Sequence, residues 1–293
     1  MPKVSVAGHE LHWVGTAPTI AGTESQVLLV LIHGAGGNHS HWAPQLAYLR
    51  RRGVRAAAFD LPGHGHSSGE APSSIATYAH IMRVALESIL ANERPGTRLA
   101  VAGHSMGGAI ALELALSRPP WLAGLGLVAT GARLRVLPSV LEKLQQGERD
   151  LRLLHMAYGP SADPDMLRRG EREYTQVPVR VLYHDYLACN AFDRLHEVAD
   201  LRLPTLVICG TEDFLTPPRY SAFMAEQTAG RLVLVPGAGH MVMLEQPEAV
   251  SEALEEFVQS LQGNPQHPDG DPQHVQGNQR RAPTAGSEAG TCV

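Results

Sequence analysis

Six short apolar segments recur along the chain, and most of them end at a glycine, a proline or a polar residue. They are residues 27–32, 54–59, 99–102, 125–128, 205–209 and 232–235. Segments of this length that are rich in Val, Ile and Leu are typical of strands buried on both faces of a sheet. The pattern therefore predicts six buried parallel strands at these positions.

Segments with helical character lie between these strands. Residues 75–92 and 249–261 have apolar positions at helical spacing, and residues 106–117 are small and apolar. Strands that alternate with helices indicate an α/β fold with a mostly parallel, doubly wound sheet. Residues 4–14, with a turn at Ala7 and Gly8, predict an N-terminal antiparallel hairpin that precedes this sheet.

The alternation stops between residues 132 and 203 and resumes at the segment 205–209. This interval contains several prolines, glycines and aromatic residues and no clear strand. A long irregular loop is the alternative, but such loops are rare in compact domains. We therefore predict a helical lid at 132–203, inserted into an α/β core made of residues 1–131 and 204–262.

The composition changes after residue 262. Residues 263–293 contain only two sizeable aliphatic side chains, Val275 and Val293, among Gly, Pro, Gln, Asn and Asp. Such a segment cannot bury enough apolar surface to offset the entropy lost on ordering. It is predicted to be a disordered C-terminal tail.

Charge and composition exclude several classes of partner. The formal net charge of −5 is mixed in sign, and no block of Lys and Arg suggests a nucleic acid or a membrane surface. No segment approaches the roughly 18 apolar residues that span a bilayer, and the start lacks the apolar core of a secretory signal. Three scattered cysteines do not indicate a disulfide framework or a zinc site. We expect a cytoplasmic monomer or small homo-oligomer that binds neither nucleic acid nor membrane.

The pattern G-x-S-x-G occurs twice, at residues 65–69 and 103–107. In a nucleophile elbow, a buried strand runs into the serine and a helix leaves it, and small flanking residues prevent clashes at the sharp turn. Ser105 lies between a predicted strand and a predicted helix. Ser67 lies in a Gly-, His- and Ser-rich segment followed by Pro72. Ser105 is therefore the predicted nucleophile, and Ser67 a loop residue.

A serine hydroxyl needs a base to take its proton. His240 follows the last predicted strand in a glycine-containing loop, and Asp213 follows the preceding strand. The carboxyl ends of parallel strands form the edge where open α/β sheets carry their active sites. We predict His240 as the base and Asp213 as the acid that orients it. Glu212 is the alternative acid and is expected to be a solvated neighbour.

Acyl transfer also needs donors for a developing oxyanion. One is expected from the backbone N–H of Met106, the residue after the nucleophile, at the start of a helix. The other is expected from the glycine-rich segment 33–37 that follows the first parallel strand. Within this segment, Ala35 N–H is the predicted donor.

At these positions the chain resembles the α/β-hydrolase fold superfamily, and specifically its branch of serine esterases, haloperoxidases and enol-lactonases. The resemblance rests on residues 33–37, 60–67, 103–107, 210–217 and 237–240, which occur in the family's order. It implies the α/β-hydrolase fold and the triad of Ser105, Asp213 and His240. It also implies that Asp60 and His64 shape the floor of the site and do not react.

The substrate side of the site is less specified. Predicted substrate contacts are Gly34 and Met241 in the core and five aromatic residues of the insertion, namely Tyr158, Tyr174, Tyr183, Tyr186 and Phe192. Ordinary packing is equally consistent with each of these aromatic residues. The pairs His39/His41 and His64/His66 are interpreted as turn and wall residues, so no metal and no cofactor are expected.

The predicted activity is hydrolysis of a small or medium carboxylic ester or lactone through an acyl-enzyme. The same triad serves C–C bond hydrolysis, amide cleavage and perhydrolysis, so these chemistries remain alternatives. A non-catalytic ligand-binding protein on the same fold is the alternative outside catalysis, because fold alone does not fix function.

Overall fold

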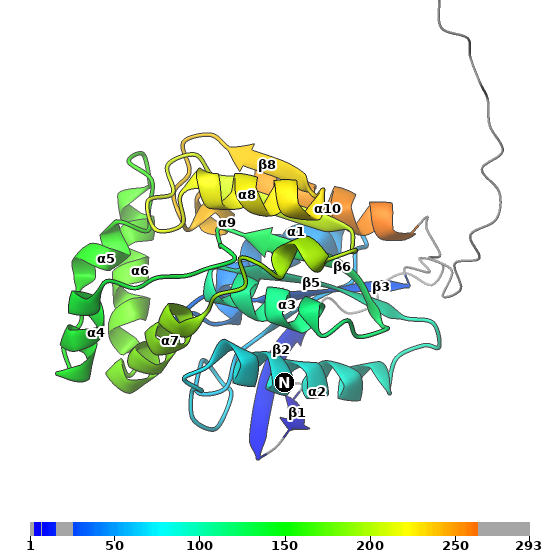
Figure 1. Ribbon diagram of the computed structural model, residues 1–293, viewed down its shortest axis with the longest axis horizontal. Helices are drawn as coiled ribbons and strands as arrows, with labels where there is room; N and C mark the ends of the chain where they lie inside the picture. The colour runs from blue at the N-terminus through cyan, green and yellow to red at the C-terminus, as the bar shows by residue number, and fades with distance from the viewer. Residues whose placement is uncertain (1–2, 7, 16–25, 263–293) are drawn as a thin grey trace, which may run out of the picture. The chain divides into compact units, whose positions relative to one another are not determined.

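The computed structural model describes residues 3–6, 8–15 and 26–262 (Figure 1). Within these ranges, eight strands form one sheet in the order β1-β2-β4-β3-β5-β6-β7-β8. The turn residue Ala7 and the predicted tail at 263–293 lie outside the described residues.

The N-terminal hairpin is present as predicted. β1 (Lys3–Val6) pairs antiparallel with β2 (His9–Gly15), and β2 continues antiparallel against β4 (Ala56–Phe59). Gly8 in the turn has a φ of +84°, a backbone conformation that glycine adopts without steric cost. The hairpin thus extends the parallel sheet by two antiparallel strands.

The six predicted parallel strands all occur. They are β3 (Val27–Ile32), β4, β5 (Arg98–His104), β6 (Leu122–Val128), β7 (Thr205–Gly210) and β8 (Arg231–Val235). The register pairs Ile32 with Gly103, His104 with Val128 and Gly210 with Val235. The loops that follow β3, β5, β6, β7 and β8 therefore open at the same edge of the sheet.

The prediction that every strand is buried on both faces is wrong for β8. Only its last residue is fully buried, and the side chain of Leu234 is 45% exposed. β8 is the last strand in the sheet order and has a single neighbour, β7. An apolar segment in the sequence does not reveal whether its strand lies in the middle or at the edge of a sheet.

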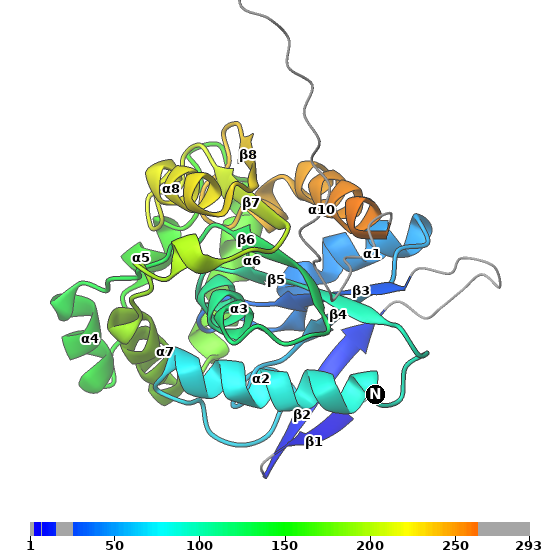
Figure 2. The same cartoon turned by 45° about the vertical axis from the view of Figure 1, so that its right-hand side comes forward.

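Helices cover both faces of the sheet (Figure 2). α2 (Ile75–Leu90), α3 (Met106–Leu116) and α8 (Pro218–Thr228) contribute to one buried apolar cluster, and α1 (Ala43–Arg51) and α10 (Pro247–Gln262) contribute to another. The two short helices η1 (His39–Trp42) and α9 (Val242–Glu245) lie in the loops after β3 and β8. The doubly wound architecture is therefore as predicted.

The interval between β6 and β7 is helical, as predicted. It contains α4 (Pro138–Gln145), α5 (Leu151–His155), α6 (Pro164–Gln176), α7 (Val179–Ala191) and the short η2 (Val198–Asp200). Asp150 and Asp163 cap α5 and α6 with their side chains, which explains why these helices begin there. The insertion belongs to the same compact unit as the sheet. That the insertion acts as a lid over the site stays a prediction.

Within the described part of the chain, no helix has the length and apolarity required to cross a membrane. The cytoplasmic location and the oligomeric state stay predictions.

Candidate active site

Ser105 is the turn between β5 and α3, and its backbone has a φ of +52° and a ψ of −117°. A non-glycine residue rarely adopts such a conformation unless its surroundings enforce it. A Cβ atom at Gly103 would lie 2.0 Å from the carbonyl oxygen of Gly107. A Cβ atom at Gly107 would lie 2.4 Å from the carbonyl oxygen of His33. The two glycines of the motif therefore let α3 start tightly against β3 and β5.

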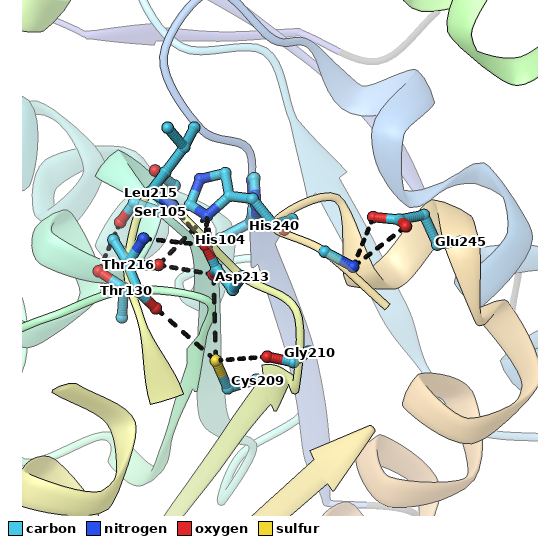
Figure 3. Close-up of polar contacts among 11 residues, drawn as sticks. His104, Ser105, Thr130, Cys209, Gly210, Asp213, Leu215, Thr216, His240 and Glu245 are labelled. Carbon is cyan, nitrogen blue, oxygen red and sulfur yellow. Dashed lines mark hydrogen bonds and ion pairs between the residues drawn. The ribbon is translucent and has the colours of Figure 1, made fainter. Parts of the chain in front are cut away.

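The strained turn is fixed by hydrogen bonds with the last residue of β6 and with the segment that follows it. Ser105 N–H donates to the carbonyl oxygen of Val128 at 2.9 Å. The Thr130 hydroxyl donates to the carbonyl oxygen of Ser105 at 2.7 Å (Figure 3). The Ser105 hydroxyl itself has no hydrogen-bond partner within the described ranges. Its side chain lines a cavity and remains available to a ligand.

Asp213 and His240 form a buried pair. His240 Nδ1 lies 2.9 Å from Asp213 Oδ2 and 3.2 Å from Oδ1 (Figure 3). Because the carboxylate accepts, Nδ1 carries the proton, and in the neutral ring Nε2 is then the free base. The tautomer that removes a proton from a serine is therefore the one that this contact selects.

Besides the weakly donating Cys209 thiol at 3.9 Å, three further N–H and O–H groups donate to the Asp213 carboxylate. Leu215 N–H and Thr216 N–H donate to Oδ1 at 2.9 and 2.8 Å, and the Thr216 hydroxyl donates to Oδ2 at 2.8 Å. Burial by itself raises the pKa of Asp213, but His240 and the hydrogen bonds from Thr216 outweigh it and leave the pKa below its usual range. Asp213 is therefore ionised at neutral pH.

Met106 and Ala35 provide backbone N–H groups at the site. Met106 is the first residue of α3, so its N–H has no acceptor one turn earlier in the helix. Ala35 lines the cavity, and its N–H has no partner among the described residues. Both groups are free to stabilise an oxyanion.

The orientation of Ala35 N–H follows from the peptide group to which it belongs. The carbonyl oxygen of Gly34 accepts from His33 Nδ1 at 2.7 Å and from Gly37 N–H at 3.1 Å, while His33 Nε2 accepts from Leu61 N–H at 3.1 Å. In a trans peptide, the N–H points opposite to the carbonyl. His33 therefore fixes the Gly34–Ala35 peptide plane, and burial keeps the pKa of His33 well below its ordinary value.

The cavity has a volume of about 340 Å³. Ser105, His240 and the predicted contacts Gly34 and Met241 line it, together with Ala35 and His104. The insertion contributes many apolar side chains to the lining, namely Leu134, Val136, Leu137, Val140, Leu153, Leu154, Met156 and Ala157. Core and insertion thus enclose the cavity together.

Three of the five aromatic residues predicted as pocket lining do line it: Tyr158, Tyr174 and Tyr186. Tyr183 does not. It packs against the small cluster of Val140, Leu144 and Leu182. Phe192 directly follows α7 and belongs to the main buried apolar cluster. The expectation that these two side chains line the pocket is therefore wrong, because the sequence did not reveal how α7 and the residue that follows it pack.

The competing candidates lie outside this cavity. The Ser67 hydroxyl donates to the carbonyl oxygen of Asp60 at 2.7 Å and accepts from His12 N–H at 2.8 Å, so it joins a loop to β2. Glu212 is exposed. The structure thus brings Asp213, and not Glu212, to His240.

His12, His39 and Asp60 lie close enough together to hold a metal ion. The Asp60 carboxylate, however, already accepts four hydrogen bonds: from His12 Nδ1, His39 Nδ1, His39 N–H and His66 N–H, at 2.7 to 3.0 Å. Four bonds use the acceptor capacity of a carboxylate. These residues fit a polar network that joins β2, η1 and the loop after β4 better than they fit a metal centre.

Three residues that sequence reasoning missed hold the loops that carry Asp213 and His240. Thr216 contacts both Asp213 and His240. His104 Nε2 donates to the carbonyl oxygen of His240 at 2.9 Å, and Glu245 accepts from Gly239 N–H at 3.0 Å (Figure 3). Of these three residues, only Thr216 could have been found from the sequence. It lies three residues after Asp213, and at this spacing a side chain can hydrogen-bond within a turn.

Comparisons with known proteins agree with this architecture. Residues 29–253 match the model of the Alpha/beta hydrolase family. The chain is 36% identical to a solved thermophilic esterase, with a TM-score of 0.74 and coverage of 89% of this chain and 97% of that one. It is 30% identical to the dihydrolipoyllysine-residue acetyltransferase component of the acetoin cleaving system of Pseudomonas putida, covering 87% of this chain and 68% of that one.

A second relative carries the name (E)-2-((N-methylformamido)methylene)succinate hydrolase, from Acinetobacter baylyi. The identity is 27%, over 79% of this chain and 90% of that one. Together with the family match and the esterase structure, it confirms the predicted fold and the predicted resemblance.

Proposed function

Because the chain belongs to the alpha/beta hydrolase family, we propose that it is a serine hydrolase that cleaves a carboxylic ester or lactone through an acyl-enzyme. The observation that carries the proposal is the combination of a strained Ser105 and a His240 oriented by Asp213, both at one cavity. The similar esterase structure supports the ester over other bonds.

In the proposed reaction, His240 Nε2 removes the proton from Ser105 Oγ as Oγ attacks the carbonyl carbon of the substrate. The N–H groups of Ala35 and Met106 stabilise the oxyanion that forms, and Asp213 stabilises the imidazolium of His240. His240 then gives its proton to the departing alcohol oxygen. Water, activated by the same histidine, releases the acid and restores the Ser105 hydroxyl.

The cavity supports a substrate of small to medium size with an apolar chain. Its volume of about 340 Å³ lies at the lower end of the range of roughly 300–1,000 Å³ that is typical of ligand pockets. Leu137, Met156 and Phe214 line the cavity and are also exposed, so apolar surface continues outward from it. We therefore propose acyl chains of intermediate length as the best substrates.

A panel of p-nitrophenyl esters from acetate to decanoate, run beside lactones and aryl amides, tests this function. We expect esters of intermediate chain length to have the highest kcat/KM. Ser105→Ala should lose about 10³-fold or more of the activity while its melting temperature stays near that of the wild type. Full ester hydrolysis by Ser105→Ala, or a folded wild type that cleaves nothing in the panel, would refute the proposal.

Amide hydrolysis is the second candidate. The observation in its favour is the relative whose named substrate contains an N-methylformamido group. The same nucleophile and oxyanion donors serve both bonds, and the amide demands a stronger protonation of its leaving nitrogen. A panel in which aryl amides are cleaved faster than the matched esters would select this candidate.

A further inference from the structure

A buried carboxylate of the insertion reaches across to the loop that carries Ala35. Asp185 lies in α7 and is fully buried. Its Oδ2 accepts from the backbone N–H of Gly36 at 2.8 Å and from His64 Nε2 at 2.9 Å. Its Oδ1 accepts from the Tyr78 hydroxyl at 2.7 Å. One side chain thus joins the insertion, the loop after β3, the loop after β4 and α2.

The partners of His64 define its charge. Its Nε2 faces the Asp185 carboxylate, and its Nδ1 lies 3.0 Å from the carbonyl oxygen of Pro62. Both of these groups accept, so both ring nitrogens donate, which only the protonated ring can do. His64 and Asp185 are therefore an ion pair with almost no exposure to solvent. A buried pair of this kind is costly to break, because the remaining charge has no partner.

The Gly36 N–H belongs to the peptide that directly follows Ala35. His33 fixes the peptide before Ala35 through the carbonyl oxygen of Gly34, and Asp185 fixes the peptide after it. Gly36 also has a φ of +64°, so this turn has a specific shape that the two hydrogen bonds stabilise. Without Asp185, the Ala35–Gly36 peptide can rotate, which displaces Gly37 and weakens its hydrogen bond to the carbonyl oxygen of Gly34. That bond is one of the two that set the plane of the Gly34–Ala35 peptide, so the direction of Ala35 N–H is then less fixed.

We propose that Asp185 is a positioning residue that aligns Ala35 N–H for the oxyanion and makes this alignment depend on the docking of α7 against the core. The inference rests on the proposed function. Asp185 does not contact the reacting atoms. It acts through Gly36, so its removal affects the transition state more than it affects substrate binding.

The neighbouring residue of α7 provides a matched control. His184 Nδ1 donates to the carbonyl oxygen of Ala71 at 2.7 Å, which also docks α7 against the core. This contact does not touch the loop that carries Ala35. If Asp185 merely anchored the helix, the variants at positions 184 and 185 would have similar effects on turnover.

The test compares kcat and KM of the wild type with those of Asp185→Ala, Asp185→Asn and His184→Ala on the best ester. For Asp185→Ala we expect kcat to fall by about 100-fold, as for the loss of an oxyanion donor, with KM within about threefold. Asn retains an oxygen that accepts from Gly36, so Asp185→Asn should recover part of the loss and keep kcat about 10-fold below the wild type. His184→Ala should keep kcat within about twofold, because it leaves the oxyanion donors untouched.

Equal kcat in the wild type and Asp185→Asn would overturn the inference, and so would an equal loss of kcat in His184→Ala. If Asp185→Ala does not fold, the comparison of Asp185→Asn with His184→Ala decides alone. Labelling of wild-type Ser105 by a fluorophosphonate separates the two proposals. A wild type that neither reacts with the probe nor hydrolyses esters overturns both proposals. An active wild type whose Asp185 variants keep the wild-type kcat overturns only this inference.

Discussion

At the scale of single residues, the Asp213 carboxylate is surrounded by donors that leave it little freedom. Two backbone N–H groups, the Thr216 hydroxyl and His240 Nδ1 all point at its two oxygens. Because the pKa of Asp213 lies below its usual range, the carboxylate stays charged when His240 takes a proton. Its proposed role is therefore both to orient the ring and to stabilise the imidazolium.

Asp213→Asn tests this role. The amide cannot stabilise the imidazolium and favours the wrong tautomer of His240, so we expect kcat to fall by about 10⁴-fold with the fold intact. Glu212→Gln, one residue away and exposed, is the matched control and should stay within about twofold. The kcat of the two purified variants decides the matter. A large loss in Glu212→Gln with an active Asp213→Asn would move the acid by one residue.

The sequence was sufficient to propose Ser105, Asp213 and His240 as a triad because each follows a strand whose end is visible as an apolar segment. Asp185 could not be predicted. It lies 149 positions from Gly36 and 121 from His64, and no local pattern joins residues so far apart. The second G-x-S-x-G motif was separated from the first by its flanking segments, and the hydrogen bonds of Ser67 agree with that choice.

At the scale of elements, the insertion supplies most of the apolar wall of the cavity. One face of α7 lines the cavity, and another packs against the rest of the insertion. Tyr186 and Cys189 line the cavity, whereas Tyr183, one turn earlier, packs within the insertion. The helical nature of this interval followed from its length and the absence of strands. Which helix face would meet the site did not follow, because that depends on how helices from distant parts of the chain pack.

This division of α7 yields a matched pair of variants. Tyr186→Ala should enlarge the cavity and shift the preferred acyl chain toward longer esters. The change in relative kcat/KM between neighbouring chain lengths should correspond to a free energy of about 1–3 kcal/mol per methylene. Tyr183→Ala should leave the profile unchanged, although it removes a side chain of the same kind. The measurement is kcat/KM for acetate through decanoate esters. Identical profiles for both variants and the wild type would show that selectivity lies elsewhere.

At the scale of the whole molecule, stability is linked to pH through the ion pair that joins insertion and core. Burial alone lowers the pKa of His64, but Asp185 outweighs it and raises the pKa above the ordinary value. The other groups that face His64 are the Pro62 carbonyl, the Asp60 carboxylate and the buried ring of His33. A raised pKa means that the folded state binds this proton more tightly than the unfolded state.

The contribution of His64 to stability is therefore fully present below its unfolded pKa of about 6.5 and is lost as the pH rises through the folded value. His64→Gln should lower the free energy of unfolding by about 3 kcal/mol near pH 6, with a smaller difference at alkaline pH. His66→Gln, in the same loop and exposed, should follow the wild type. Melting temperatures between pH 6 and 10 check this. A constant gap between wild type and His64→Gln would contradict the linkage.

The proposed mechanism depends above all on Ser105 being the nucleophile at the cavity. The most direct test is reaction with a fluorophosphonate, followed by intact-mass measurement and peptide mapping of the wild type, Ser105→Ala and Ser67→Ala. We expect a single adduct on Ser105 in the wild type and in Ser67→Ala, and no adduct in Ser105→Ala. An adduct on Ser67, or a folded wild type that does not react, would contradict it.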